Sequence, residues 1–136
     1  MVIARPKRSR ERRRSAGFTL IELMVVLAVI ALLLSVAVPR YFHSVNRAKE
    51  SVLRANLAAT RDALDKYFGD TGHYPDSLEQ LVQSHYLRAL PVDPITESVT
   101  TWTVIPPNRI ERTGAVFDLH SGAPGKASDG SNYSDW

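Results

Sequence analysis

The residue with the most informative position in this sequence is Glu22, a carboxylate inside an apolar run. Between Phe18 and Val38 only Thr19, Glu22 and Ser35 are polar. A carboxylate in such a run costs about 3 kcal/mol in a membrane, so it persists where it has a partner or a task. Glu22 either lies near the membrane interface and reaches water, or forms a buried ion pair with a cation of another chain.

The other residue types do not assemble into a catalytic site. The chain has no cysteine, which excludes disulfides and thiolate metal ligands. Its four histidines are far apart in sequence and form no ligand-like pair, so a catalytic zinc site is not expected. No serine stands in a nucleophile elbow. We therefore expect a protein that is not an enzyme. The histidines are His43, His73, His85 and His120.

The apolar run around Glu22 is long enough to cross a membrane. A helix over Phe18–Val38 spans roughly 30 Å, the hydrocarbon thickness of a bilayer. A buried core helix is the alternative, but so small a domain could not cover it on all sides. Residues 1–17 hold seven Lys and Arg against one acid, whereas 18–136 hold ten against thirteen acids. This asymmetry keeps the N-terminus in the cytoplasm and exports the C-terminal part.

An ordinary secretory signal peptide is the main rival to a membrane helix. Signal peptides carry a shorter apolar run that is followed by a small-x-small cleavage site. Here the run is too long, and the residues after it, Pro39–Phe42, make a poor site for signal peptidase. The small residues stand before the run instead, at Ser15–Gly17.

The helical pattern continues past Pro39. Proline removes one backbone hydrogen bond, so we expect a kink there rather than a helix end. A helix over Phe18–Phe68 would be roughly 77 Å long, and the Gly69–Gly72 segment would end it with a left-handed cap. Two apolar stripes are predicted on its second half. One holds Leu53, Leu57, Leu64 and Phe68, and the other holds Val45, Ala48, Val52, Ala59 and Ala63.

Shorter elements are predicted after the long helix. Asp76 and Glu79 have the spacing of a capping box and predict a short helix. Alternating apolar residues predict strands at Thr101–Ile105 and Ala115–His120, with a weaker strand at Arg109–Arg112. The buried face of the short helix is expected at Leu78, Leu81, Val82 and His85, and Trp102 is expected in the core.

The tail, Ser121–Trp136, is rich in Gly and Ser and cannot hold regular structure for long. The rings of Tyr133 and Trp136 would pin it to the body. The predicted fold class is therefore α+β: a long N-terminal helix, with a membrane-spanning half and an amphipathic half, packed on a short helix and a small antiparallel sheet.

The motif Gly17-Phe18-Thr19-Leu20-Ile21-Glu22, after a basic leader and before an apolar run, resembles the class III signal of type IV pilins and type II secretion pseudopilins. The resemblance implies that a prepilin peptidase cuts between Gly17 and Phe18 and methylates the new amine of Phe18. It also implies that Glu22 is the carboxylate used in filament assembly. The charges agree, because a free amine at Phe18 is a cation at membrane depth that a neighbouring Glu22 neutralises.

Later segments extend the resemblance. Gly72–Pro75 resembles the family's G-x-Y-P segment, and Leu90–Pro94 resembles the L-P-x-D-P segment of the major (G-type) pseudopilin. Pro39 stands where the family's long helix bends. Two departures are present. Without cysteine the disulfide loop of typical type IV pilins is missing, which favours a pseudopilin. Glu97 stands in a turn where the family commonly has glycine.

The resemblance also implies a calcium ion in the C-terminal loop, as in major pseudopilins. The tail offers hard oxygen ligands of the type that calcium prefers, and Asp129 and Asp135 are the preferred candidates. No EF-hand spacing is present, and a polar surface loop containing Asp and Ser is the alternative. The full set of candidate oxygens is Asp118, Ser121, Ser128, Asp129, Asn132 and Asp135.

The predicted domains are a cleaved leader at 1–17, a transmembrane and assembly helix at 18–39, and a periplasmic pseudopilin domain at 40–136. The resemblance implies a structural subunit of a type II secretion pseudopilus, which polymerises with copies of itself. The subunit starts in the bacterial inner membrane and assembles into a periplasmic filament. The implied partners are minor pseudopilins, an inner-membrane assembly platform and prepilin peptidase.

Three alternatives stay open. The chain could be a major or minor subunit of a type IV pilus, or a single-pass anchored periplasmic binding protein that does not polymerise. A DNA-uptake pilin is the third. The acidic excess of 18–136 argues against it, because binding to the phosphate backbone needs a clustered basic surface. No nucleic-acid partner is predicted.

Overall fold

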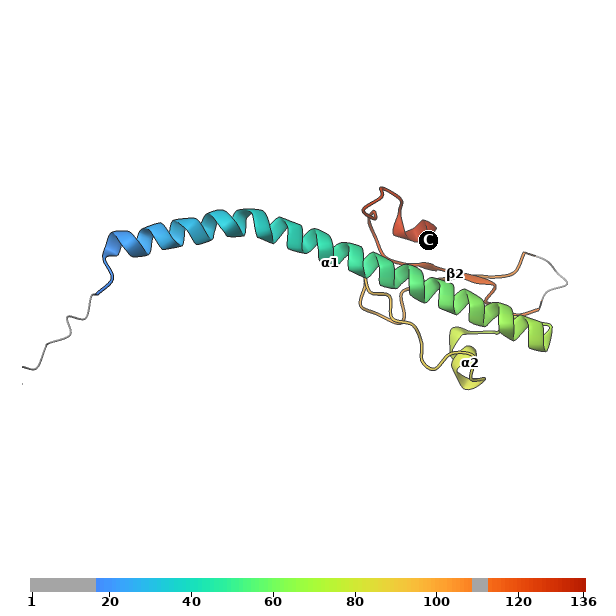
Figure 1. Ribbon diagram of the computed structural model, residues 1–136. Helices are drawn as coiled ribbons and strands as arrows, with labels where there is room; N and C mark the ends of the chain where they lie inside the picture. The colour runs from blue at the N-terminus through green and yellow to red at the C-terminus, as the bar shows by residue number, and fades with distance from the viewer. Residues whose placement is uncertain (1–16, 109–112) are drawn as a thin grey trace, which may run out of the picture. The chain divides into compact units, whose positions relative to one another are not determined.

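The computed structural model describes residues 17–108 and 113–136, and the chain forms two compact units, Met1–Pro39 and Arg40–Trp136. The predicted α+β fold class is confirmed. The predicted strand at Arg109–Arg112 lies outside the described residues. In chain order the elements are α1 (Leu20–Thr71), α2 (Leu78–Gln83), β1 (Trp102–Ile105), β2 (Asp118–Ser121) and the 3-10 helix η1 (Tyr133–Asp135) (Figure 1).

Helix α1 contains Pro39 and continues through it, as predicted, while the kink stays a prediction. The helix ends three residues later than expected. Gly72, rather than Gly69, takes the left-handed conformation with φ of 76°. Its N–H donates to the Phe68 carbonyl at 2.8 Å, which closes the last turn.

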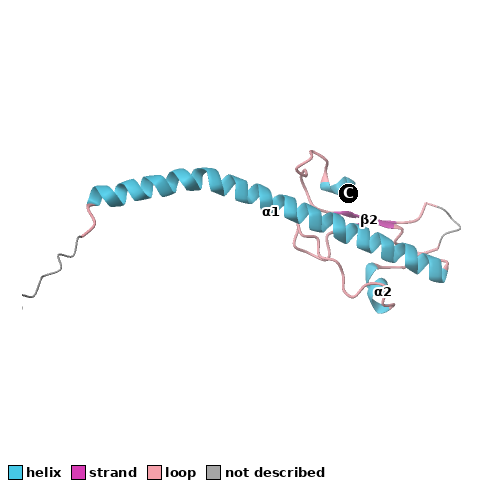
Figure 2. Cartoon of the chain, in the orientation of Figure 1, coloured by secondary structure: helices cyan, strands magenta, loops and turns pink. Residues whose placement is uncertain are grey.

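The second half of α1 supplies one side of the core in the 40–136 unit. Leu53, Leu57 and Leu64 of the first predicted stripe are at most 2% exposed and face the core, while Phe68, its fourth member, is partly buried. The second stripe is wrong in large part, because Ala48, Val52 and Ala59 are exposed. A two-stranded sheet and a six-residue helix lie beside the second half of α1 (Figure 2). The core is completed by Leu81, Trp102, Val116, Leu119 and Tyr133.

Strands β1 and β2 pair antiparallel, with Trp102 opposite Ser121 and Ile105 opposite Asp118. β2 begins three residues later than predicted, because the preceding residues bond elsewhere. The N–H groups of Ala115 and Val116 both donate to the Pro75 carbonyl, at 3.1 and 3.0 Å. The first residues of the predicted strand Ala115–His120 are thus hydrogen-bonded to Pro75, in the segment after α1, rather than to β1.

Helix α2 starts at Leu78 with Ser77 as its N-cap, so the predicted capping box is wrong. The side chain of Gln80 accepts instead from the backbone N–H of Asp76, at 2.7 Å. Leu78 and Leu81 are buried as expected. His85 is exposed rather than buried, because it follows the helix in a left-handed conformation with φ of 64°.

The Leu90–Pro94 segment is fixed by a fully buried carboxylate. Asp93 accepts from the Ile95 N–H at 2.8 Å and from the Ser121 hydroxyl at 2.5 Å, which links this loop to the end of β2. Glu97 takes the left-handed conformation that glycine favours, with φ of 57°. Its carboxylate lies 2.9 Å from Lys49 Nζ, so the departure from glycine adds an ion pair to α1.

Candidate functional site

The predicted processing motif lies at the start of α1. Gly17, Phe18 and Thr19 precede the helix, and Phe18 is 84% exposed. The Thr19 hydroxyl accepts the backbone N–H of Glu22 at 3.2 Å, so Thr19 is the N-cap and Glu22 lies in the first turn. The peptide bond between Gly17 and Phe18 is therefore presented outside the helix, where an enzyme can reach it.

The apolar run after this motif has no cover within its own unit. The side chains from Leu20 to Val38 are all exposed, including those of Leu32 and Leu33 at 68% and 64%. Among the described residues α1 is the one helix that is long and apolar enough to cross a membrane. Its carboxylate, Glu22, makes no ion pair within the described residues, so its predicted pairing with an amine of another chain stays a prediction.

Comparison with known proteins decides the family. Residues 12–38 match the prokaryotic N-terminal methylation motif. The type II secretion system core protein G of Pseudomonas aeruginosa is 34% identical over 92% of this chain and 95% of its own length. The chain belongs to the type II secretion core protein G family. The core protein G of Escherichia coli K12 is 33% identical over 60% of the chain and 67% of its own length.

The type IV major pilin PilA of Myxococcus xanthus is 37% identical, but the match covers 54% of this chain and only 33% of the pilin. No solved structure matches the chain significantly. The likeness to core protein G therefore covers nearly the whole of both chains, and the likeness to the pilin covers a smaller part of both.

A buried carboxylate on α1 binds the C-terminal tail of this core protein G homologue. Glu50 is 8% exposed. It accepts hydrogen bonds from the Ser128 N–H at 2.8 Å, the Ser128 hydroxyl at 2.5 Å and the Tyr133 hydroxyl at 3.1 Å. Burial alone would raise the pKa of Glu50, but the hydrogen bonds from Ser128 and then Tyr133 outweigh burial and hold it below its usual value.

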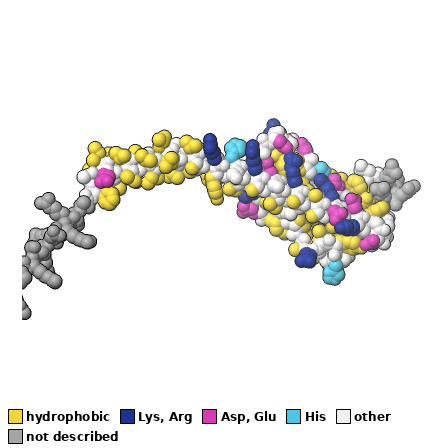
Figure 3. Space-filling model, in the orientation of Figure 1, with side chains coloured by type: hydrophobic (Ala, Val, Ile, Leu, Met, Phe, Trp, Pro, Cys, Tyr) yellow, Lys and Arg dark blue, Asp and Glu magenta, His cyan; other side chains and the backbone are white. Residues whose placement is uncertain are grey.

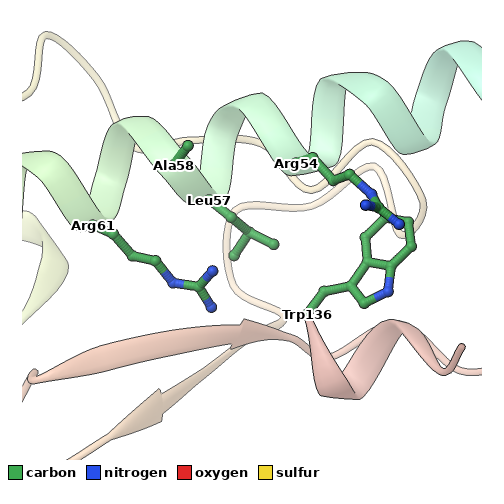
Figure 4. Close-up of a pocket in the computed structure, with 5 residues that line it drawn as sticks. All are labelled: Arg54, Leu57, Ala58, Arg61 and Trp136. Atoms are coloured by element: carbon green, nitrogen blue, oxygen red, sulfur yellow. The ribbon is translucent and has the colours of Figure 1, made fainter.

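Two arginine side chains further along α1, about one and three turns after Glu50, bind acids in the C-terminal part of the chain. Arg54 Nη2 lies 2.8 Å from Asp129 Oδ2, and its guanidinium stacks over the Trp136 ring at 3.9 Å from the centroid. Arg61 Nε lies 2.7 Å from Asp118 Oδ1. Figure 4 shows Arg54 and Trp136 on one side of a groove of about 250 Å³ and Arg61 on the other. We call the contacts of Glu50 and Arg54 with the tail the C-terminal clasp.

The preferred calcium ligands already have partners within the chain. Asp129 Oδ1 accepts from the Ser131 hydroxyl at 2.6 Å, and Asp129 Oδ2 faces Arg54. Hydrogen bonds from Ser131, and then Arg54, hold the pKa of Asp129 below its usual value. Asp135 accepts from the Asn132 amide at 2.9 Å. The oxygen atoms suit calcium, but an ion at Asp129 would compete with Arg54 for the same carboxylate. Calcium binding stays a prediction.

The sequence predicts Gly17, Phe18 and Glu22 as one motif. It did not lead us to the N-cap that starts their helix, or to the carboxylate that holds the tail. The T-x-x-E spacing from Thr19 to Glu22 is a capping signal that would have identified the N-cap. Glu50 shares a helix face with Leu53 and Leu57, which marks it as a buried acid that needs donors. That signal was present in the sequence, whereas its donors in the tail could be found only from the structure.

We predict that Glu50→Ala releases the tail of a fragment spanning 40–136. The donors on Ser128 and Tyr133 lose their acceptor, and an unsatisfied buried donor costs about 1–3 kcal/mol. The free energy of unfolding, measured by chemical denaturation, should fall by that amount. Glu79→Ala removes an exposed acid of α2 and is the control. Equal effects of the two substitutions would contradict a role of Glu50 in holding the tail.

The same carboxylate predicts a pH dependence. Because the folded pKa of Glu50 is lowered, its stabilisation is present above the unfolded value of about 4.3 and is lost as pH falls through the lowered folded pKa. Between about pH 5 and pH 3, the melting temperature of Glu50→Gln should therefore fall less than that of the wild type.

Proposed function

We propose that this chain is a structural subunit of the type II secretion pseudopilus. The observation that carries the proposal is the methylation motif, set before an uncovered apolar helix, in a chain that resembles core protein G over nearly its whole length. The role is that of a building block, without catalysis.

The membrane topology follows from the charges and the apolar run. Residues 18–39 anchor the chain once in the inner membrane, the leader at 1–17 stays cytoplasmic, and 40–136 enter the periplasm. Prepilin peptidase removes the leader after Gly17 and methylates Phe18. Minor pseudopilins and an inner-membrane assembly platform are the further partners of this proposal.

Assembly moves the apolar half of α1 from lipid into a bundle of copies. The exposed side chains from Leu20 to Val38 then pack against those of neighbouring subunits. Glu22 neutralises the methylated amine at Phe18 of a neighbour, because a lone charge of either sign in such a bundle is costly. Within one chain, Glu22 also lies in the first turn of α1, where the helix dipole favours an acid.

The processing step predicts the mass of the mature protein. A chain extracted from membranes should begin at Phe18 and carry one N-methyl group, as intact-mass spectrometry would show. Gly17→Val should leave the leader attached, because a branched side chain replaces the glycine at the cleavage site. A mature chain that begins at Met1, or beyond Pro39, would contradict the assignment of the motif.

The assembly step predicts that Glu22→Ala leaves insertion and processing intact but prevents filament formation. Leaving one partner of a buried ion pair alone costs about 3–5 kcal/mol. Filaments sheared from cells that overexpress the chain would be counted by negative-stain microscopy.

Thr19→Ala is the matched control, because it removes the N-cap but keeps the carboxylate. It should leave filaments in place. Normal filaments from Glu22→Ala would favour an anchored protein that does not polymerise. Loss of filaments from both variants would assign the effect to the helix start rather than to charge.

A second proposal concerns calcium, which Asp129 and Asp135 would hold in the tail. Its support is the family resemblance and the density of oxygen ligands. Bound calcium should raise the melting temperature of the 40–136 fragment by mass action, and Asp129→Ala should remove the rise. Arg54→Met frees Asp129 and should enlarge it. An identical melting curve in calcium and in chelator, for wild type and Arg54→Met, would contradict calcium binding in the tail.

A further inference from the structure

Four arginines stand at a seven-residue spacing along α1: Arg40, Arg47, Arg54 and Arg61. Seven residues are close to two helical turns, so the four side chains form one stripe that drifts by about 20° at each step. Successive members lie about 10 Å apart along the axis. Figure 3 shows Lys and Arg side chains in a row along this helix, all within the 40–136 unit.

The two halves of this arginine stripe differ in their partners. Arg54 and Arg61 are bound to Asp129 and Asp118 of the same chain. Arg40 and Arg47 are exposed, and no ion pair to either occurs within residues 17–108 and 113–136. Both lie within ten residues of the exported end of the apolar run, a place where membrane proteins carry fewer cations than on the cytoplasmic side.

An acid on the same face of α1 complements the free half of the stripe. Asp65 follows Arg47 by 18 residues, which is five full turns, so the two lie on one line of the helix about 27 Å apart. Asp65 is exposed and has no ion pair within the described residues. Ser51 and Ala58 lie exposed within about 40° of this line, and such short side chains let a second helix approach closely.

We propose that Arg47 of one copy pairs with Asp65 of a second copy, with the two α1 helices parallel and offset by about 27 Å. Copies anchored in one membrane are necessarily parallel, because each exports the same end. The contact joins two different patches of the surface, so it repeats from copy to copy and builds a filament rather than a closed dimer. This inference rests on the proposed function, because it requires a chain that polymerises.

A charge swap tests the pairing in the full chain. Arg47→Glu sets two carboxylates against each other and should reduce filaments by about tenfold or more. Asp65→Arg should do the same, and the double variant Arg47→Glu/Asp65→Arg should recover filaments. Arg88→Glu makes the same charge change at an exposed arginine away from α1 and should leave filaments unchanged.

Cysteine cross-linking tests the distance, since the natural chain has no cysteine. The double variant Arg47→Cys/Asp65→Cys cannot close a disulfide within one chain, because both residues stand about 27 Å apart on one helix. Oxidation of sheared filaments should therefore give a ladder of linked copies. The matched variant Arg88→Cys/Asp65→Cys should give none.

Each result decides the proposal. Normal filaments from Arg47→Glu, or filaments without the 47–65 ladder, would overturn it. A double variant Arg47→Glu/Asp65→Arg that forms no more filaments than Arg47→Glu alone would also overturn it. Arg47 would then be assigned to another anion, such as a lipid headgroup. A wild-type chain that forms no filaments would instead contradict the proposed function, so the two failures are distinguishable.

Discussion

The structure depends on a single constraint: a helix of 52 residues has far more apolar surface than so small a chain can cover. The 40–136 unit covers one stripe of α1, where Leu53, Leu57 and Leu64 are buried. The side chains from Leu20 to Val38 receive no cover at all in their own unit. Burial of apolar surface stabilises by about 25 cal/mol per Å², so this half of α1 requires lipid or other copies of the chain. Insertion into a membrane and assembly into a filament are two solutions to the same physical problem.

Polar contacts hold the loops and the tail to the rest of the domain, a role that apolar packing has in proteins with a larger core. Within residues 17–108 and 113–136, two short strands and two short helices accompany α1, and the connections between them are long. Buried carboxylates fix these connections: Asp93 joins the 90–94 loop to the end of β2, and Glu50 joins α1 to the tail. Each accepts several hydrogen bonds, which offset the free-energy cost of burying a polar side chain. The loops and the tail are therefore ordered by acids at defined positions rather than by apolar volume.

Periodicity was sufficient to predict the long helix, its passage through Pro39, its buried leucine stripe and the two strands. These are the features that local spacing and propensity determine. The errors arose where distant segments compete for the same groups. Ala48 and Val52 of the second stripe are exposed, because the described segments pack on the leucine stripe instead. β2 is shortened because the Pro75 carbonyl binds the N–H groups of Ala115 and Val116. No local sequence pattern indicates such a competition. Nor does any local pattern indicate which donors of the tail bind Glu50.

The arginine stripe shows how one sequence period serves two purposes along one helix. Repetition every seven residues keeps Arg40, Arg47, Arg54 and Arg61 on a flank of α1 that the core leaves open. Towards the C-terminal end of the stripe the tail and β2 fold back, and their acids meet Arg54 and Arg61. Towards the membrane the described residues make no ion pair with Arg40 or Arg47, and both cations stay exposed. The reach of the folded domain, rather than a change of sequence, thus separates the arginines that hold the subunit together from those available to a neighbour.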